Sequence, residues 1–113
     1  MEPECTCVPL VREPLSAEAA VQLAATLKAL SDPVRLRLLS IVASHEGGEA
    51  CVCDLSVGIE VTQPTISHHL KVLRNAGLLQ SERRASWVYY RVNQAALHHL
   101  SQLLGVDALS PMT

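Results

Sequence analysis

The sequence contains no phenylalanine, and aromatic residues make up only 3% of its 113 residues. A hydrophobic core therefore has to be built from aliphatic side chains, and the 18 leucines favour helices over a β-sandwich. No stretch of 18 apolar residues occurs either, so a membrane-spanning helix is not predicted. Hydrophobic residues still make up 49% of the chain, which is enough for one folded domain of this length.

An excess of positive charge is also missing, because the formal net charge at pH 7 is −2. The total hides an uneven distribution along the chain. Residues 1–62 carry four basic and nine acidic side chains, whereas residues 63–91 carry five basic side chains and one acidic. A basic segment in an otherwise acidic chain indicates one face that meets nucleic acid.

A secretory leader is not expected, because the first residues are acidic and no apolar segment follows them. We therefore predict a cytoplasmic protein with no membrane partner. Its four cysteines form two Cys-x-Cys pairs, Cys5/Cys7 and Cys51/Cys53. In a reducing compartment, paired thiols more often bind soft metals or carry out redox chemistry than form structural disulfides. Packing as small buried hydrophobic side chains is the alternative interpretation of Cys51 and Cys53.

Hydrophobic periodicity predicts a mainly helical chain with one β-hairpin. Residues 1–15 contain three prolines and are expected to form a flexible arm that carries Cys5 and Cys7. After Leu78 the period changes to strict alternation, which predicts two strands and a turn near Arg84 to Ser86. Helices are expected from Ser16 to about Leu30, from Asp32 to about Ser44, from near Cys51 or Cys53 to Gly58, from Thr62 to Gly77, and from Gln94 to Leu104.

A short helix, a turn and a second helix, followed by a hairpin, make a winged helix-turn-helix. We therefore predict one such domain over residues 16–105, with a C-terminal tail over residues 106–113. Leu97, Leu100, Leu103 and Leu104 form a stripe on the last helix. A stripe of this kind on the terminal helix of a small domain predicts that the protein is a homodimer.

The predicted second helix of the helix-turn-helix carries polar side chains opposite its apolar stripe. Short hydrogen-bonding groups precede cations on this face, as in a helix that reads the major groove of double-stranded DNA. A solvated polar face is the alternative interpretation. We predict base contacts from Gln63, Thr65, Ser67 and His68, phosphate contacts from Lys71 and Arg74, and wing contacts from Arg83 and Arg84.

Four segments of the chain carry a combination of motifs: LSDPVRLRLL at 30–39, EACVCDL at 49–55, QPTISHHL at 63–70 and WVYY at 87–90. In combination they resemble the ArsR/SmtB family of metal-responsive winged-helix repressors. The resemblance covers residues 17–104, and it implies a homodimer that represses a metal-resistance operon and leaves its operator when metal binds. The hairpin departs from the commonest family pattern, which has a glycine in the turn where this chain has Ala85 and Ser86.

The resemblance identifies Cys51 and Cys53 as the family's metal box. In the most similar arsenite-type boxes a third cysteine follows, and that position is Ser56 here. Family members that combine N-terminal and box cysteines imply that Cys7, Cys5 or both complete the site. The family's second metal site, on the last helix, is not expected, because its first ligands correspond to Gln94 and Ala96.

The number of sulfur ligands bears on the identity of the inducer. Three thiolates suit As(III) or Sb(III), which we predict, whereas four suit Cd(II), Pb(II) or Zn(II). A Cd(II)- or Pb(II)-sensing repressor with a four-cysteine site therefore stays open as an alternative. A small thiol-redox enzyme is a second alternative, although Cys-x-Cys differs from the Cys-x-x-Cys of thioredoxin-like proteins. We predict that the chain is not an enzyme.

Overall fold

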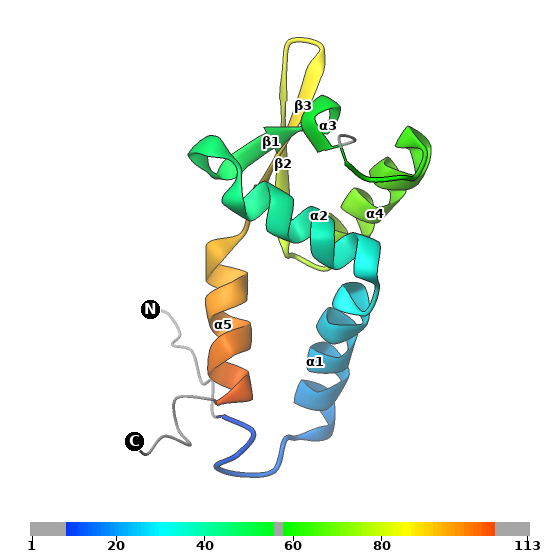
Figure 1. Ribbon diagram of the computed structural model, residues 1–113. Coiled ribbons are helices and arrows are strands. Elements are labelled where there is room, and N and C mark those ends of the chain that lie inside the picture. The colour runs from blue at the N-terminus through cyan, green and yellow to red at the C-terminus, as the bar shows by residue number, and fades with distance from the viewer. Residues whose placement is uncertain (1–8, 56–57, 106–113) are drawn as a thin grey trace.

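The computed structural model describes residues 9–55 and 58–105 (Figure 1). Cys5, Cys7, Ser56 and the predicted C-terminal tail lie outside these residues. The predicted helices and hairpin are confirmed, and the structure adds a one-turn 3₁₀ helix at Glu46–Gly48 and a short strand. The elements are α1 (Ala17–Leu30), α2 (Pro33–Ser44), β1 (Glu49–Cys51), α3 (Val52–Leu55), α4 (Gln63–Asn75), β2 (Leu79–Arg84), β3 (Trp87–Val92) and α5 (Gln94–Leu104).

The helices begin where capping side chains satisfy their first backbone N–H groups. Ser16 accepts a hydrogen bond from the N–H of Ala19 at 3.0 Å, and Asp32 accepts one from Arg35 at 3.0 Å. Thr62 caps α4 and Asn93 caps α5 in the same way. Side-chain oxygens at these positions replace the backbone partners that a first helical turn lacks, which explains why the helix starts were predictable.

The sheet has three antiparallel strands in the order β1-β3-β2, so the sequence-based prediction of a two-stranded hairpin was incomplete. In β1, Glu49 lies opposite Arg91, Ala50 opposite Tyr90 and Cys51 opposite Tyr89. The expected helix near Cys51 or Cys53 is confirmed as α3, which begins at Val52, while Cys51 itself ends the strand. Cys51 and Cys53 therefore lie on two different elements.

The core is aliphatic, as the lack of phenylalanine predicts, with Tyr90 the one aromatic side chain buried among the described residues. It lies where α2, α4 and the inner face of the sheet meet. The largest fully buried side chains are Leu38, Val42, Leu55, Ile66, Leu70, Leu73 and Leu78. This packing fixes α4 against the body of the molecule and leaves its opposite face in solvent.

The ends of the molecule differ in character (Figure 1). The hairpin of β2 and β3 projects from one end, and α1 and α5 extend toward the other. Large apolar side chains are exposed on these two helices: Val21 is 69% exposed, Leu27 41% and Leu104 37%. The exposed apolar surface agrees with the prediction of a dimer, which a single chain does not test. None of the helices within residues 9–55 and 58–105 has the length and hydropathy needed to cross a membrane.

The described part of the N-terminal arm is bound to the end of α5. The backbone N–H of Leu10 donates to the carbonyl of Leu103 at 2.9 Å. Gly105 ends α5 with a positive φ of 68°, and a Cβ at that position would lie 2.7 Å from the Cβ of Pro9. Only glycine combines this backbone conformation with so close an approach, so the contact is built into the end of the helix.

Candidate metal site and nucleic-acid interface

The two box cysteines meet at the junction of β1 and α3. The thiol of Cys53 donates to the sulfur of Cys51 at a sulfur–sulfur distance of 2.7 Å, and the Cys53 backbone N–H also donates to that sulfur at 3.3 Å. Cys51 is buried, whereas the Cys53 residue is exposed. The hydrogen bond to Cys51, followed by desolvation, raises the pKa of the Cys53 thiol. Two sulfurs therefore converge on one point at the protein surface.

A carboxylate and an imidazole lie beside the cysteines. Asp54 accepts a hydrogen bond from the backbone N–H of Cys51 at 3.4 Å, and its Oδ2 lies 3.8 Å from His45 Nε2. In the described part of the chain, no three His, Cys, Asp or Glu side chains are grouped so that they could hold a metal ion. The residues of the described chain thus supply two soft donors, and a thiophilic ion needs at least one more.

The polar face of α4 is accessible, as its predicted role requires. Gln63, His68, Lys71 and Arg74 are exposed, while Ile66, Leu70 and Leu73 on the opposite face are buried. Thr65 and Ser67 are partly buried, and the Thr65 hydroxyl hydrogen-bonds that of Thr62 at 2.9 Å. Arg74 reaches from α4 to the hydroxyl of Ser81 on β2 at 3.4 Å, which places one face of the wing next to the exposed side of α4.

The two wing arginines do not lie together. Successive side chains of a strand point to opposite faces, so Arg83 shares the face of Ser81 and Arg84 points to the other face. Arg84 forms a bidentate ion pair with Glu49, at 2.7 and 2.8 Å, and a contact with Glu82 at 3.0 Å. Of the two predicted DNA contacts on the wing, the structure brings only Arg83 to the face that borders α4.

Sequence reasoning did not single out Glu49, although its carboxylate contacts two arginines of the sheet, Arg84 and Arg91. The hydrogen bonds from Arg84 lower the pKa of Glu49. Nη1 of Arg91 lies 3.7 Å from Oε1 of Glu49. The guanidinium of Arg84 also lies over the ring of Tyr89, 4.6 Å from its centroid. This cluster has no local signal in the sequence, because Glu49 and Arg84 are 35 positions apart.

Another residue that sequence reasoning missed is Arg35, which connects α4 to the first two helices. Its Nε donates to the carbonyl of Ala29 at 2.6 Å, and its Nη1 lies 3.3 Å from Nδ1 of His69. His69 therefore faces the helices, while His68 is exposed on the polar face of α4. The two rings are tilted by 54°, with centroids 5.8 Å apart, so adjacent histidines serve different faces of α4.

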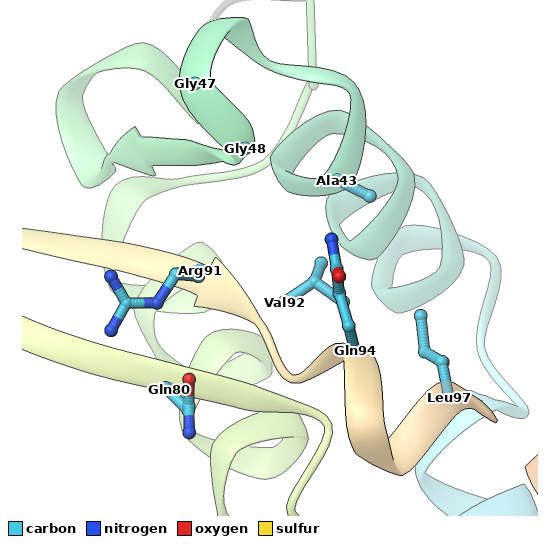
Figure 2. Close-up of a pocket in the computed structure, with 8 residues that line it drawn as sticks. All are labelled: Ala43, Gly47, Gly48, Gln80, Arg91, Val92, Gln94 and Leu97. Atoms are coloured by element: carbon cyan, nitrogen blue, oxygen red, sulfur yellow. The ribbon is translucent and has the colours of Figure 1, made fainter. Parts of the chain in front are cut away.

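A shallow pocket lies at the base of the sheet, between α2, the Gly47–Gly48 bend and α5 (Figure 2). Its volume is about 490 Å³, and Figure 2 shows Gln94 of α5 reaching toward Ala43 of α2. The lining residues are Ala43, Gly47, Gly48, Gln80, Arg91, Val92, Gln94 and Leu97. This lining includes no cysteine, histidine or carboxylate, so the pocket offers no partner for thiol chemistry.

Residues 32–81 match the family model described as "Bacterial regulatory protein, arsR family". The chain is 46% identical over 66 residues to the arsenic resistance transcriptional regulator ArsR1 of Pseudomonas putida, a match that covers 58% of this chain and 50% of that protein. The chain thus spans half the length of that curated relative.

Two further comparisons cover more of the chain. It is 32% identical over 93 residues to the cadmium resistance regulatory protein CadC homolog of Staphylococcus aureus, covering 82% of this chain and 73% of that one. Among solved structures, the AntR antimony-specific transcriptional repressor is 26% identical, with a TM-score of 0.66 over 94% of this chain and 95% of that one. The observed winged helix is thus the fold of these regulators.

Proposed function

The chain belongs to the arsR family of bacterial regulatory proteins, and we propose that it is a repressor that leaves operator DNA when As(III) or Sb(III) binds its cysteines. The observation that carries the proposal is the convergence of the Cys51 and Cys53 sulfurs at the start of α3, the first helix of the helix-turn-helix. Thiolates select soft, thiophilic ions, and three of them match the trigonal geometry that As(III) prefers. Similar regulators named for arsenic and antimony resistance support this choice.

We assign the remaining sulfur ligands to the N-terminal arm of the partner subunit in a homodimer. From Leu103 to Gln94, α5 rises about 14 Å. From Val92 to Tyr89, which lies opposite Cys51, β3 adds about 10 Å. In Figure 1, α5 and β3 continue in the same general direction, so the box lies far from the end of α5.

The length of the arm favours a partner subunit over the same chain. Cys7 precedes Leu10 by three residues, and an extended chain of that length spans at most about 11 Å. The backbone as far as Cys5 spans at most about 18 Å, so Cys5 would reach across about 24 Å only with the arm fully extended and with its side chain and the sulfur–ion bonds making up the rest. While Leu10 stays bound to Leu103, we therefore assign the arm to the box of another subunit. Cys7 and Cys5 are both assigned as candidate ligands.

In the proposed DNA complex, the exposed face of α4 lies in the major groove. Gln63, Thr65, Ser67 and His68 contact base edges there, and Lys71 and Arg74 contact phosphates. Arg83 extends the cationic surface along the wing. Closing of the arm over Cys51 and Cys53 shifts β1 and α3 relative to α4, which weakens DNA binding. By linkage, DNA weakens ion binding by the same factor, on the order of 5- to 150-fold.

The decisive experiment measures binding of labelled operator DNA by fluorescence anisotropy, with and without arsenite. We expect arsenite to weaken binding of the wild-type protein, and to leave binding by the Cys51→Ser/Cys53→Ser variant unchanged. The matched control is Ser44→Ala, which removes a hydroxyl from the exposed end of α2 and should respond like the wild type. Release of DNA from the double cysteine variant would refute the site, and no release from the wild type would refute the function.

A Cd(II)- or Pb(II)-sensing repressor with a four-cysteine site is the second candidate. The similarity to the cadmium resistance regulator favours it, as does the presence of four cysteines in two pairs. The same anisotropy titration, repeated with cadmium and lead, separates the two. A response to arsenite that needs three of the four cysteines supports the first candidate, whereas a response to cadmium that needs all four supports the second. We assign no catalytic role, since the related proteins are transcriptional regulators.

A further inference from the structure

The box cysteine Cys51 and the wing share one face of the sheet. Residues directly opposite each other in antiparallel strands point to the same side, so Cys51, Tyr89 and Glu82 form a row across all three strands. Glu49, Arg91 and Gln80 form the adjacent row in the same way. Cys51 of the metal box and the outer face of the wing are therefore parts of a single hydrogen-bonded sheet.

The side chain of Glu49 on β1 connects to the end of β2, across the middle strand β3. Its two carboxylate oxygens accept hydrogen bonds from both terminal nitrogens of Arg84, the last residue of β2, at 2.7 and 2.8 Å. The stack of Arg84 on Tyr89 places the guanidinium over the residue that lies opposite Cys51. Bidentate pairs of this kind fix direction as well as distance, because the planar fork matches the carboxylate.

We propose that Glu49 is the positioning residue that transmits ion binding from Cys51 to the wing, through its ion pair with Arg84. This inference rests on the proposed function. Glu49 and Cys51 are the two ends of a three-residue strand, so a displacement of Cys51 moves Glu49 with it. The Glu49 carboxylate then carries Arg84, and with it the turn of the wing, away from the position that suits DNA.

The chain provides a matched control for this role. Glu82 also contacts Arg84, at 3.0 Å, but it lies on β2 itself, two residues before Arg84. Replacing Glu82 with glutamine removes a negative charge from Arg84 without cutting the connection to β1. Replacing Glu49 with glutamine removes one charge as well, and it also breaks the bidentate link, because an amide presents only one oxygen to the guanidinium.

A natural probe reports on the wing. Trp87 is the only tryptophan in the sequence, it is 54% exposed, and it lies directly opposite Arg84. Its fluorescence can be followed during titration of the DNA-free protein with arsenite. We expect arsenite to change the emission of the wild type and of Glu82→Gln, and to leave that of Glu49→Gln nearly unchanged.

Operator binding supplies the second measurement. The ratio of dissociation constants with and without arsenite is expected to stay at the wild-type value in Glu82→Gln and to approach unity in Glu49→Gln. Arsenite binding, followed by the absorbance of the arsenic–thiolate bonds, should persist in both variants. Thermal unfolding of both variants establishes that the sheet is intact.

The outcomes separate this inference from the proposed function. If arsenite does not weaken operator binding by the wild type, the proposed function fails. If the wild type responds and Glu49→Gln responds to the same extent, the function stands and the role of Glu49 is refuted. An equal loss of response in Glu49→Gln and Glu82→Gln would also refute it, since charge alone would then account for the effect.

Discussion

Leu10 donates its backbone N–H to the carbonyl of Leu103, and this bond fixes the arm at the end of the molecule opposite the wing. Cys7 precedes Leu10 by three residues in the sequence. While this bond holds, the chain before Leu10 starts from the end of the molecule that lies opposite the wing. The proposal that the arm completes the site of a partner subunit rests on this relationship.

Mixed dimers test whether a site is shared between subunits. One chain carries Cys5→Ser/Cys7→Ser and the other carries Cys51→Ser/Cys53→Ser, and a dimer of the two is purified with two different affinity tags. If the arm acts across the dimer, one intact box meets one intact arm, and we expect one arsenite to bind per mixed dimer. Each variant alone should lack a complete site. A mixed dimer that binds no arsenite more tightly than its parents would contradict the shared site.

The two wing arginines are expected to contribute differently to DNA binding. Arg83→Ala should weaken operator binding and reduce the slope of log K against log salt by about one, as the loss of a phosphate contact does. Arg84→Ala should leave that slope nearly unchanged, because Glu49 and Glu82 already neutralise Arg84. Binding measured over a series of salt concentrations provides both slopes. Equal slopes for the two variants would contradict the prediction that only the Arg83 face of the wing contacts DNA phosphates.

The carboxylate of Asp32, which caps α2, is expected to make the free energy of unfolding depend on pH. The hydrogen bond from the backbone of Arg35 lowers the pKa of Asp32 below its usual value of 3.8. Because the folded pKa is the lower one, this contribution to stability is complete above the unfolded pKa and is lost as the pH falls through the folded value.

Asp32→Asn provides the comparison, since asparagine also caps helices but does not titrate. We expect the wild type to gain stability relative to this variant between about pH 3 and pH 5, measured by urea unfolding. A constant difference between the two proteins over this range would argue against the proposed titration.

The turn of the wing contains a strained residue. Ala85 has a φ of 56°, the left-handed conformation that residues with a Cβ adopt only at a cost. Ala85→Gly should therefore raise the free energy of unfolding by about 0.5–1 kcal/mol. Ser86 does not share this conformation, so Ser86→Gly serves as the control and should not stabilise the protein. Urea unfolding of the three proteins decides; a midpoint for Ala85→Gly at or below the wild-type value would contradict the expectation.

Much of the fold could be predicted because its signals are local. Ser16, Asp32 and Thr62 mark helix starts through a hydrogen bond to a backbone N–H three residues later. The hairpin follows from alternation over 14 residues. The strand β1 was missed because three residues cannot establish a period, and because its partner Tyr89 lies 38 positions further along the chain.

The site was predictable only in part, for the same physical reason. The motif Cys51-Val52-Cys53 is local, and the structure brings both sulfurs together. The anchor of the arm is a bond between two backbone groups, Leu10 and Leu103, and no side-chain pattern encodes it. The ion pair of Glu49 with Arg84 depends on the register of the sheet, which the sequence does not reveal without β1.

The alternation of Arg83 and Arg84 also limits how the wing can change in length. A shift of one residue in the register of β2 would exchange the two side chains between faces. The cation now held by Glu49 would then point toward α4, and the one beside α4 would take its place opposite Glu49. A single insertion or deletion that shifted β2 in this way would leave the strand paired but its two arginines interchanged.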